Sequence, residues 1–246
     1  SHTPHYNFFN IYSLMLSFSL QFLLLLQSTI AINTITCRTF LIPTLQVSKI
    51  GFACYPAATT AATNELYPLH IFAHGNGAGG AVIHIYTSLM KTIASHGFVV
   101  VAYESCPIDS RCHNGETQFI EALKTIAYLE NNRKTLPIQF QQPYSASGHS
   151  TGARAVLMLA ACRDNPLYLK HVQFINVTQS DRNVLTRIHA VVGDHPDPMI
   201  DPAQNPDIHA YNITKTPTML VTGTLDVRPI GEPSLSGWQD FVMMPS

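Results

Sequence analysis

Charge is scarce in this chain. Only 12% of its 246 residues are Asp, Glu, Lys or Arg, and the formal net charge is −1. No cluster of Lys or Arg stands out, so the basic footprint of a nucleic-acid-binding protein is missing and no nucleic-acid partner is expected. The apolar share of 46% excludes an intrinsically disordered chain, because such chains have too few apolar residues to form a core.

The usual metal-binding patterns are also absent. The sequence contains neither a Cys-x-x-Cys pair nor a His-Glu-x-x-His helix, so we predict no metal site. Five cysteines are present, and Cys106 and Cys112 bracket one short loop. These two are the leading candidates for a disulfide, although the spacing fits two free thiols nearly as well.

The longest uncharged run covers residues 14–32 and is mostly apolar. Small residues around Ala31 follow it, as at a signal-peptide cleavage site, and this pattern predicts secretion. A basic segment before the run is missing and the run is almost long enough to cross a membrane, so a signal anchor and a buried helix remain alternatives. We therefore assign residues 1–32 to a signal peptide with upstream residues, and residues 33–246 to one domain. No stable membrane insertion is expected once the signal is cleaved.

Short β-branched runs alternate with helix-patterned stretches over the rest of the chain. The strand candidates are residues 67–75, 98–104, 143–150, 187–195 and 217–226. The helix candidates are residues 81–95, 116–131 and 152–162, and the last of these is apolar nearly all round. Residues 163–186 fit neither pattern clearly. Such alternation predicts an α/β fold with a doubly wound, mostly parallel sheet.

One strand candidate ends at GHSTG (148–152), which matches the G-x-S-x-G pattern. The pattern alone is weak, but here a strand precedes it and a helix of small residues follows, as a nucleophile elbow requires. In such an elbow Ser150 stands at a helix N-terminus, where the helix dipole favours developing negative charge. The alternative is an ordinary strand–helix turn with incidental glycines.

A glycine-rich segment, HGNGAGG (74–80), follows the first strand candidate. Its glycines let backbone N–H groups approach a substrate oxygen, so we predict an oxyanion hole formed by the N–H groups of Asn76 and Thr151. His74 is expected to support this loop. The same glycines also spell G-x-G-x-x-G, with Glu104 at the end of the next strand, which leaves a dinucleotide site as the competing interpretation.

Taken in order, HGNGAGG, ASHGFVVVAYES and GHSTG resemble the chlorophyllase and cutinase-like polyester hydrolase branch of the α/β-hydrolases, over roughly residues 50–241. The resemblance implies a cofactor-free serine hydrolase of carboxylic esters with a Ser–Asp–His triad in that chain order. Its acid follows the seventh strand, which points to Asp226, with Asp194 after the preceding strand as the alternative. The implied partner is a small-molecule or lipid-like ester.

The histidine of that triad has no counterpart after Asp226, because His209 is the last histidine of the chain. We therefore expect the printed sequence to lack the general base together with the last strand and helix. His195, in GDHPDP, is the one upstream histidine placed to replace it, since a triad is defined by geometry. A non-catalytic, hydrolase-like protein that binds a lipid or a partner is the alternative function.

Overall fold

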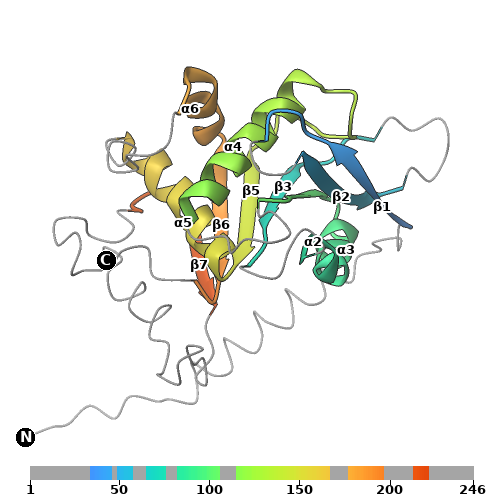
Figure 1. Ribbon diagram of the computed structural model, residues 1–246, viewed down its shortest axis with the longest axis horizontal. Coiled ribbons are helices and arrows are strands. Elements are labelled where there is room, and N and C mark those ends of the chain that lie inside the picture. Colours follow the sequence, from blue (N-terminus) through green and yellow to red (C-terminus); the bar gives the residue numbers. More distant parts are fainter. Residues whose placement is uncertain are drawn as a thin grey trace, which may run out of the picture.

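The computed structural model describes residues 34–45, 49–57, 65–75, 82–105, 115–166, 177–196 and 213–221. Within them, seven strands form one sheet in the order β1-β2-β4-β3-β5-β6-β7 (Figure 1). The strands from β4 to β7 in this order pair in parallel, whereas β2 pairs antiparallel with both β1 and β4. This confirms the predicted α/β class with a mostly parallel sheet.

The elements follow one another with strands and helices interleaved. The strands are β1 (Ile35–Leu41), β2 (Ile50–Pro56), β3 (Leu69–Ala73), β4 (Val99–Tyr103), β5 (Tyr144–His149), β6 (Ile188–Asp194) and β7 (Thr218–Val221). The helices are α2 (Val82–Ile85), α3 (Thr87–Ser95), α4 (Gly115–Asn131), α5 (Thr151–Asp164) and α6 (Gln179–Leu185).

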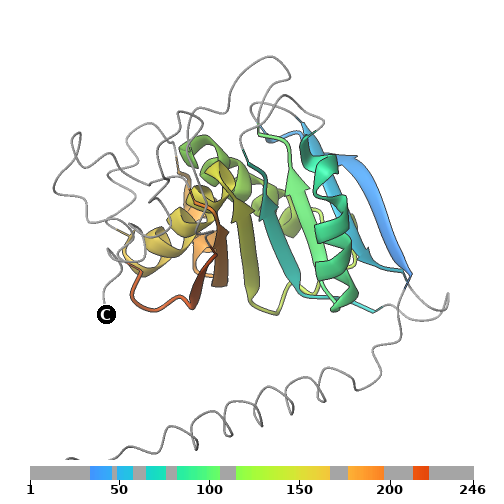
Figure 2. The ribbon, with the colours of Figure 1, turned by 90° about the horizontal axis from the view of Figure 1, so that it is seen from below.

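Helices cover both faces of the sheet. Figure 2 shows α3 in front of the strands and α4 and α5 behind them. Alternate residues of each central strand accordingly enter different cores: in β4, Val99 and Val101 join the cluster under α4 and α5, whereas Val100 and Ala102 join the cluster under α3. A strand buried on both faces is why this segment reads as a continuous apolar run in the sequence.

Two helical regions differ from the sequence prediction. The helix expected over residues 81–95 divides at Tyr86 into α2 and α3, and Leu89, an apolar residue of this segment, is 44% exposed. The segment without a clear pattern contains α6, which begins with a capping box. There the side chain of Thr178 accepts from the Asp181 N–H, and the Asp181 carboxylate accepts from the Thr178 N–H. Each bond satisfies an N–H group that the first helical turn leaves open.

The strands β1 and β2 were not singled out in the sequence, and they carry the disulfide. Cys37 and Cys54 face each other in the antiparallel register and are covalently linked. A disulfide is therefore present, and it joins two cysteines that the sequence analysis did not single out. Cys106 and Cys112 lie outside the described residues, and Cys162 is a buried free thiol.

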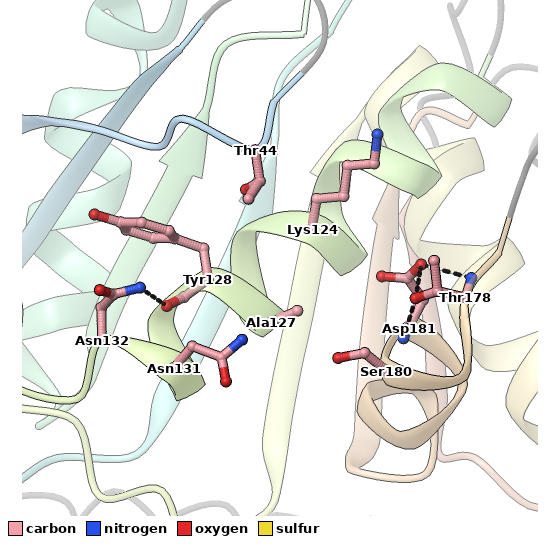
Figure 3. Close-up of a pocket in the computed structure, with 9 residues that line it drawn as sticks. All are labelled: Thr44, Lys124, Ala127, Tyr128, Asn131, Asn132, Thr178, Ser180 and Asp181. Carbon is pink, nitrogen blue, oxygen red and sulfur yellow. Dashed lines mark hydrogen bonds between the residues drawn. The ribbon is translucent and has the colours of Figure 1, made fainter.

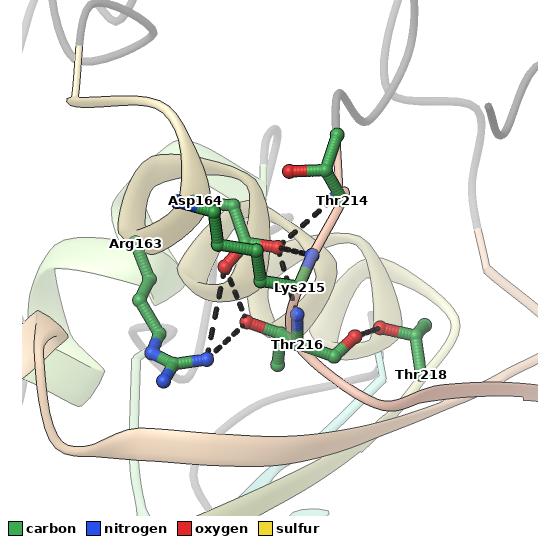
Figure 4. A network of polar contacts seen from close by, with 6 residues as sticks. All are labelled: Arg163, Asp164, Thr214, Lys215, Thr216 and Thr218. Atoms are coloured by element: carbon green, nitrogen blue, oxygen red, sulfur yellow. Dashed lines mark hydrogen bonds and ion pairs between the residues drawn. The ribbon is translucent and has the colours of Figure 1, made fainter.

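The C-terminal end of α5 is tied to the segment that leads into β7. The Asp164 carboxylate accepts the backbone N–H groups of Thr214, Lys215 and Thr216, at 2.9, 2.6 and 2.8 Å (Figure 4). The Thr216 hydroxyl also donates to it, at 2.8 Å. One side chain thus fixes where the chain enters β7.

No helix in the described ranges is both long and apolar enough to cross a membrane. The predicted signal peptide falls outside those ranges.

Candidate active site

Ser150 forms the turn between β5 and α5, with φ 55° and ψ −121°. Positive φ is strained for a non-glycine residue, and such strain is typical of nucleophile elbows. The turn is fixed on both sides, because the Ser150 N–H donates to the Asp194 carbonyl at 2.9 Å and the Arg154 N–H donates to the Ser150 carbonyl at 3.1 Å. Ser150 is half-buried at the carboxyl end of the parallel strands.

The two glycines of the motif allow three backbones to meet at this turn. A Cβ atom on Gly148 would lie 2.3 Å from the carbonyl oxygen of Gly152, and one on Gly152 would lie 2.2 Å from that of Ala73. Both distances are far below van der Waals contact, and the clashing atoms are backbone atoms. The sequence pattern therefore reflects close packing of β5, α5 and β3.

The loop after β3 is held by His74. Its Nδ1 donates to the carbonyl oxygen of Gly75 at 2.8 Å, and its Nε2 accepts from the Ser105 N–H at 3.3 Å. Burial lowers the pKa of His74, so the imidazole is neutral and can accept at Nε2. These contacts fit the supporting role expected for His74. Asn76 lies outside the described residues, whereas Thr151 is buried in the first turn of α5.

Tyr86 connects this loop with the elbow, a connection that sequence reasoning missed. The Gly75 N–H donates to the Tyr86 hydroxyl oxygen at 3.2 Å, and that oxygen lies 2.8 Å from Nδ1 of His149. Burial is the main cause that raises the pKa of Tyr86, so the phenol stays protonated. In the sequence, Tyr86 is one of several apolar residues with helical spacing, and His149 occupies a variable position of the G-x-S-x-G pattern. Neither position therefore indicates that the two side chains are in contact.

Asp194 and His195 lie at the end of β6, beside the elbow. Their side chains are joined by a 2.6 Å contact between Oδ1 of Asp194 and Nδ1 of His195. His195 has φ 48°, its N–H donates to the Val221 carbonyl at 2.7 Å, and its ring centroid is 6.2 Å from that of His149. The structure therefore pairs the alternative acid with the alternative base. Asp226 lies outside the described residues.

A pocket of about 400 Å³ between α4 and α6 lies apart from these residues (Figure 3). Its single carboxylate belongs to Asp181, which the capping box already uses. Glu130, near the C-terminal end of α4, bonds to Tyr144 and Arg187 at the starts of β5 and β6. The C-terminal end of α4 therefore lies at the N-terminal ends of β5 and β6, whereas Ser150 lies at their C-terminal ends.

Comparison with known proteins agrees with this geometry. No curated protein matches the chain significantly. The model of the family described as Chlorophyllase matches residues 55–181, just over half of the chain. The matched range includes His74, the elbow and all of α5. The family is of the α/β-hydrolase type, and its name denotes an esterase-type hydrolase. The chain therefore belongs to the chlorophyllase family.

Proposed function

We propose that this protein is a serine hydrolase of carboxylic esters with Ser150 as the nucleophile. The observation that carries the proposal is the backbone of Ser150, which adopts a left-handed conformation at the N-terminus of α5. This conformation lifts the hydroxyl out of the strand and places it beside the first backbone N–H groups of the helix.

The oxyanion hole of the proposal consists of the N–H groups of Thr151 and Asn76. Thr151 directly follows Ser150 and is the first residue of α5, the position that supplies one oxyanion donor in this fold. Asn76 directly follows Gly75, whose N–H and C=O are held by Tyr86 and His74. Both backbone polar groups of Gly75 are thus held, directly before the residue that supplies the second donor, which favours a preorganised site.

In the reaction, the Ser150 Oγ attacks the ester carbonyl while an imidazole takes its proton. The two N–H groups stabilise the oxyanion, the alcohol leaves with the proton from the imidazolium, and water then hydrolyses the acyl-enzyme. We assign Asp226 as the acid that orients the imidazole; in this assignment the imidazole belongs to a histidine that the sequence shown does not contain, because no histidine follows Asp226 in it. A small-molecule or lipid-like ester is the substrate class.

A second assignment of acid and base has its own supporting observation. Asp194 lies 2.6 Å from Nδ1 of His195, which is the contact that orients a catalytic base. Asp194 is the last residue of β6 and its carbonyl accepts from the Ser150 N–H, and His195 directly follows it. In this assignment the Asp194–His195 pair replaces the acid and base of the family's usual order.

Secretion is part of the proposal and is supported by the Cys37–Cys54 disulfide, because disulfides persist in oxidising compartments.

Turnover of p-nitrophenyl acetate tests the proposed function and separates the two assignments. Ser150→Ala should reduce kcat to background. In a protein that also carries a histidine after Asp226, loss of activity in Asp226→Asn with activity kept in His195→Asn supports Asp226 as the acid. Loss of activity in His195→Asn with activity kept in Asp226→Asn supports the Asp194–His195 pair. His189→Asn is the matched control, because His189 is an exposed residue of the same strand β6. Full turnover in Ser150→Ala would overturn the proposal.

A further inference from the structure

Three potential metal ligands meet at the carboxyl ends of β5 and β6. His149, Asp194 and His195 each offer one donor atom, and these atoms all lie within 4.8 Å of one another. Two imidazoles and one carboxylate are a donor set that suits Zn²⁺ and related transition-metal ions. The His149–Asp194 pair is also in direct register across the two strands, so rigid elements supply the ligands.

One of the three donor–donor distances is close to the value that a bound ion requires, and the other two are at most 4.8 Å. Donors on a tetrahedral Zn²⁺ at about 2.0–2.1 Å lie roughly 3.3 Å apart. Nδ1 of His195 and Oδ1 of Asp194 are already 2.6 Å apart, so an ion that replaces the proton between them opens the pair by less than about 1 Å. The side chains of His195 and Asp194 are 36% and 42% exposed, which leaves both room to move and a path for the ion.

His149 has the outer partner that metal-bound histidines commonly have. Its Nδ1 lies 2.8 Å from the Tyr86 hydroxyl oxygen, which also accepts from Gly75. In the tautomer in which the Nδ1–H of His149 donates to the Tyr86 oxygen, this bond orients the ring and leaves the Nε2 lone pair for an ion. On the other strand, the backbone of His195 is fixed by its bond to Val221.

We propose that His149, Asp194 and His195 form a binding site for one transition-metal ion of the Zn²⁺ type. With three protein ligands the fourth position stays open to water. With two neutral imidazoles and one carboxylate as ligands, a bound Zn²⁺ keeps a net positive charge, which disfavours the imidazolium that the general base forms when it takes the proton of Ser150. Occupancy should therefore inhibit ester hydrolysis, and this second consequence rests on the proposed function.

Binding is tested without reference to catalysis, on the full chain carrying Ser150→Ala. Titration calorimetry with zinc chloride should give one site per chain, and Co²⁺ should give the visible absorption of a bound ion. His149→Gln and His195→Asn should each weaken Zn²⁺ binding by at least about 10-fold. Asn is chosen at residue 195 because it tolerates a positive φ. Circular dichroism checks that each variant is folded.

His189→Asn is the control for adventitious binding, because His189 is exposed on β6 and outside the cluster. Unchanged affinity in this variant supports the site, whereas equal weakening in all three variants, or no weakening in either cluster variant, overturns it. Ester turnover with the wild-type serine is then measured with and without Zn²⁺. Turnover that persists at saturating Zn²⁺ refutes the predicted inhibition alone. A protein that binds Zn²⁺ but shows no ester turnover even in its absence refutes the proposed function and leaves the metal site intact.

Discussion

The backbone N–H of Ser150 donates a 2.9 Å hydrogen bond to the carbonyl oxygen of Asp194. This bond continues the β5–β6 ladder by one residue, into the turn itself. Ser150 and His195 are also the two non-glycine residues with positive φ in the described part of the chain. The two strained residues thus lie at the ends of the neighbouring strands β5 and β6, and they are the candidate nucleophile and a candidate base.

Replacing Gly152 with Ala should strongly destabilise the fold. The new Cβ would lie 2.2 Å from the Ala73 carbonyl oxygen, and backbone cannot yield as a side chain can. We expect a loss of about 3 kcal/mol or more in the free energy of unfolding, measured by urea denaturation. Gly193→Ala is the matched control, since its nearest contacts are leucine side-chain atoms at 3.2 Å. An equal loss in both variants would contradict the packing argument.

Reducing the Cys37–Cys54 disulfide should lower stability by about 3 kcal/mol, the value expected for a loop of this size. Thermal melting with and without reductant measures the effect, and the Cys37→Ser/Cys54→Ser double variant should no longer respond to reductant. Non-reducing peptide mapping also tests the pairing directly. Recovery of Cys37 and Cys54 as free thiols from secreted protein would refute it, and the same map shows whether Cys106 and Cys112 are joined.

Stability should fall in mild acid because of His70. Its ring lies between Ser145 and Ser147, with contacts of 2.8 and 2.7 Å to their hydroxyl oxygens, and burial lowers the pKa of His70 from 6.5 to about 4. The unfolded chain therefore takes up this proton at a higher pH than the folded chain does. The stabilisation is complete above pH 6.5 and is lost as the pH falls towards 4, to a total of about 3 kcal/mol.

His70→Gln removes the titrating group, so its unfolding free energy should decline less over the same pH range. Urea denaturation of both proteins at pH 7 and pH 4 gives the comparison. Parallel pH profiles would show that other groups cause the acid sensitivity.

Asp164→Ala should loosen the entry to β7. The substitution removes the acceptor for three backbone N–H groups, although water can bond to some of them in its place. We therefore expect the free energy of unfolding to fall by about 1–2 kcal/mol. Hydrogen exchange should increase in Thr218–Val221 more than in β5. Arg163→Gln is the comparison, because it removes the 3.7 Å ion pair with Asp164 and a 2.7 Å bond to the Thr216 hydroxyl but leaves the acceptor of the three backbone N–H groups in place, so its loss should cost less. Unchanged exchange in β7 after Asp164→Ala would refute the role of the carboxylate.

The sequence predicted the parts of the fold whose pattern is local. Apolar β-branched runs predicted β3, β4, β5 and β6, and the glycines of GHSTG predicted the tight turn between β5 and α5, because each depends on neighbours in the chain. The Asp194–His195 pair was also accessible as an alternative, since the two residues are adjacent and follow a strand.

Contacts between distant segments could not be predicted in this way. Tyr86 lies in a helical pattern that gives no reason for a break, yet it caps α3 and its hydroxyl bonds to the loop after β3. The Cys37–Cys54 link depends on the β1–β2 register, whereas Cys106 and Cys112 were favoured by spacing alone. A single sequence shows periodicity but not which strands pair or how a helix packs on them. The disulfide depends on the first and the Tyr86 contacts on the second.

The central claim is that Ser150 is an activated nucleophile, and labelling with a fluorophosphonate probe tests it most directly. The probe phosphonylates an activated serine, so mass spectrometry of the labelled protein should locate the adduct on the peptide that contains Ser150. Ser150→Ala should abolish labelling, whereas Ser180→Ala, a substitution on α6, should leave it unchanged. Labelling that survives Ser150→Ala, or an adduct mapped to another serine, would contradict the account.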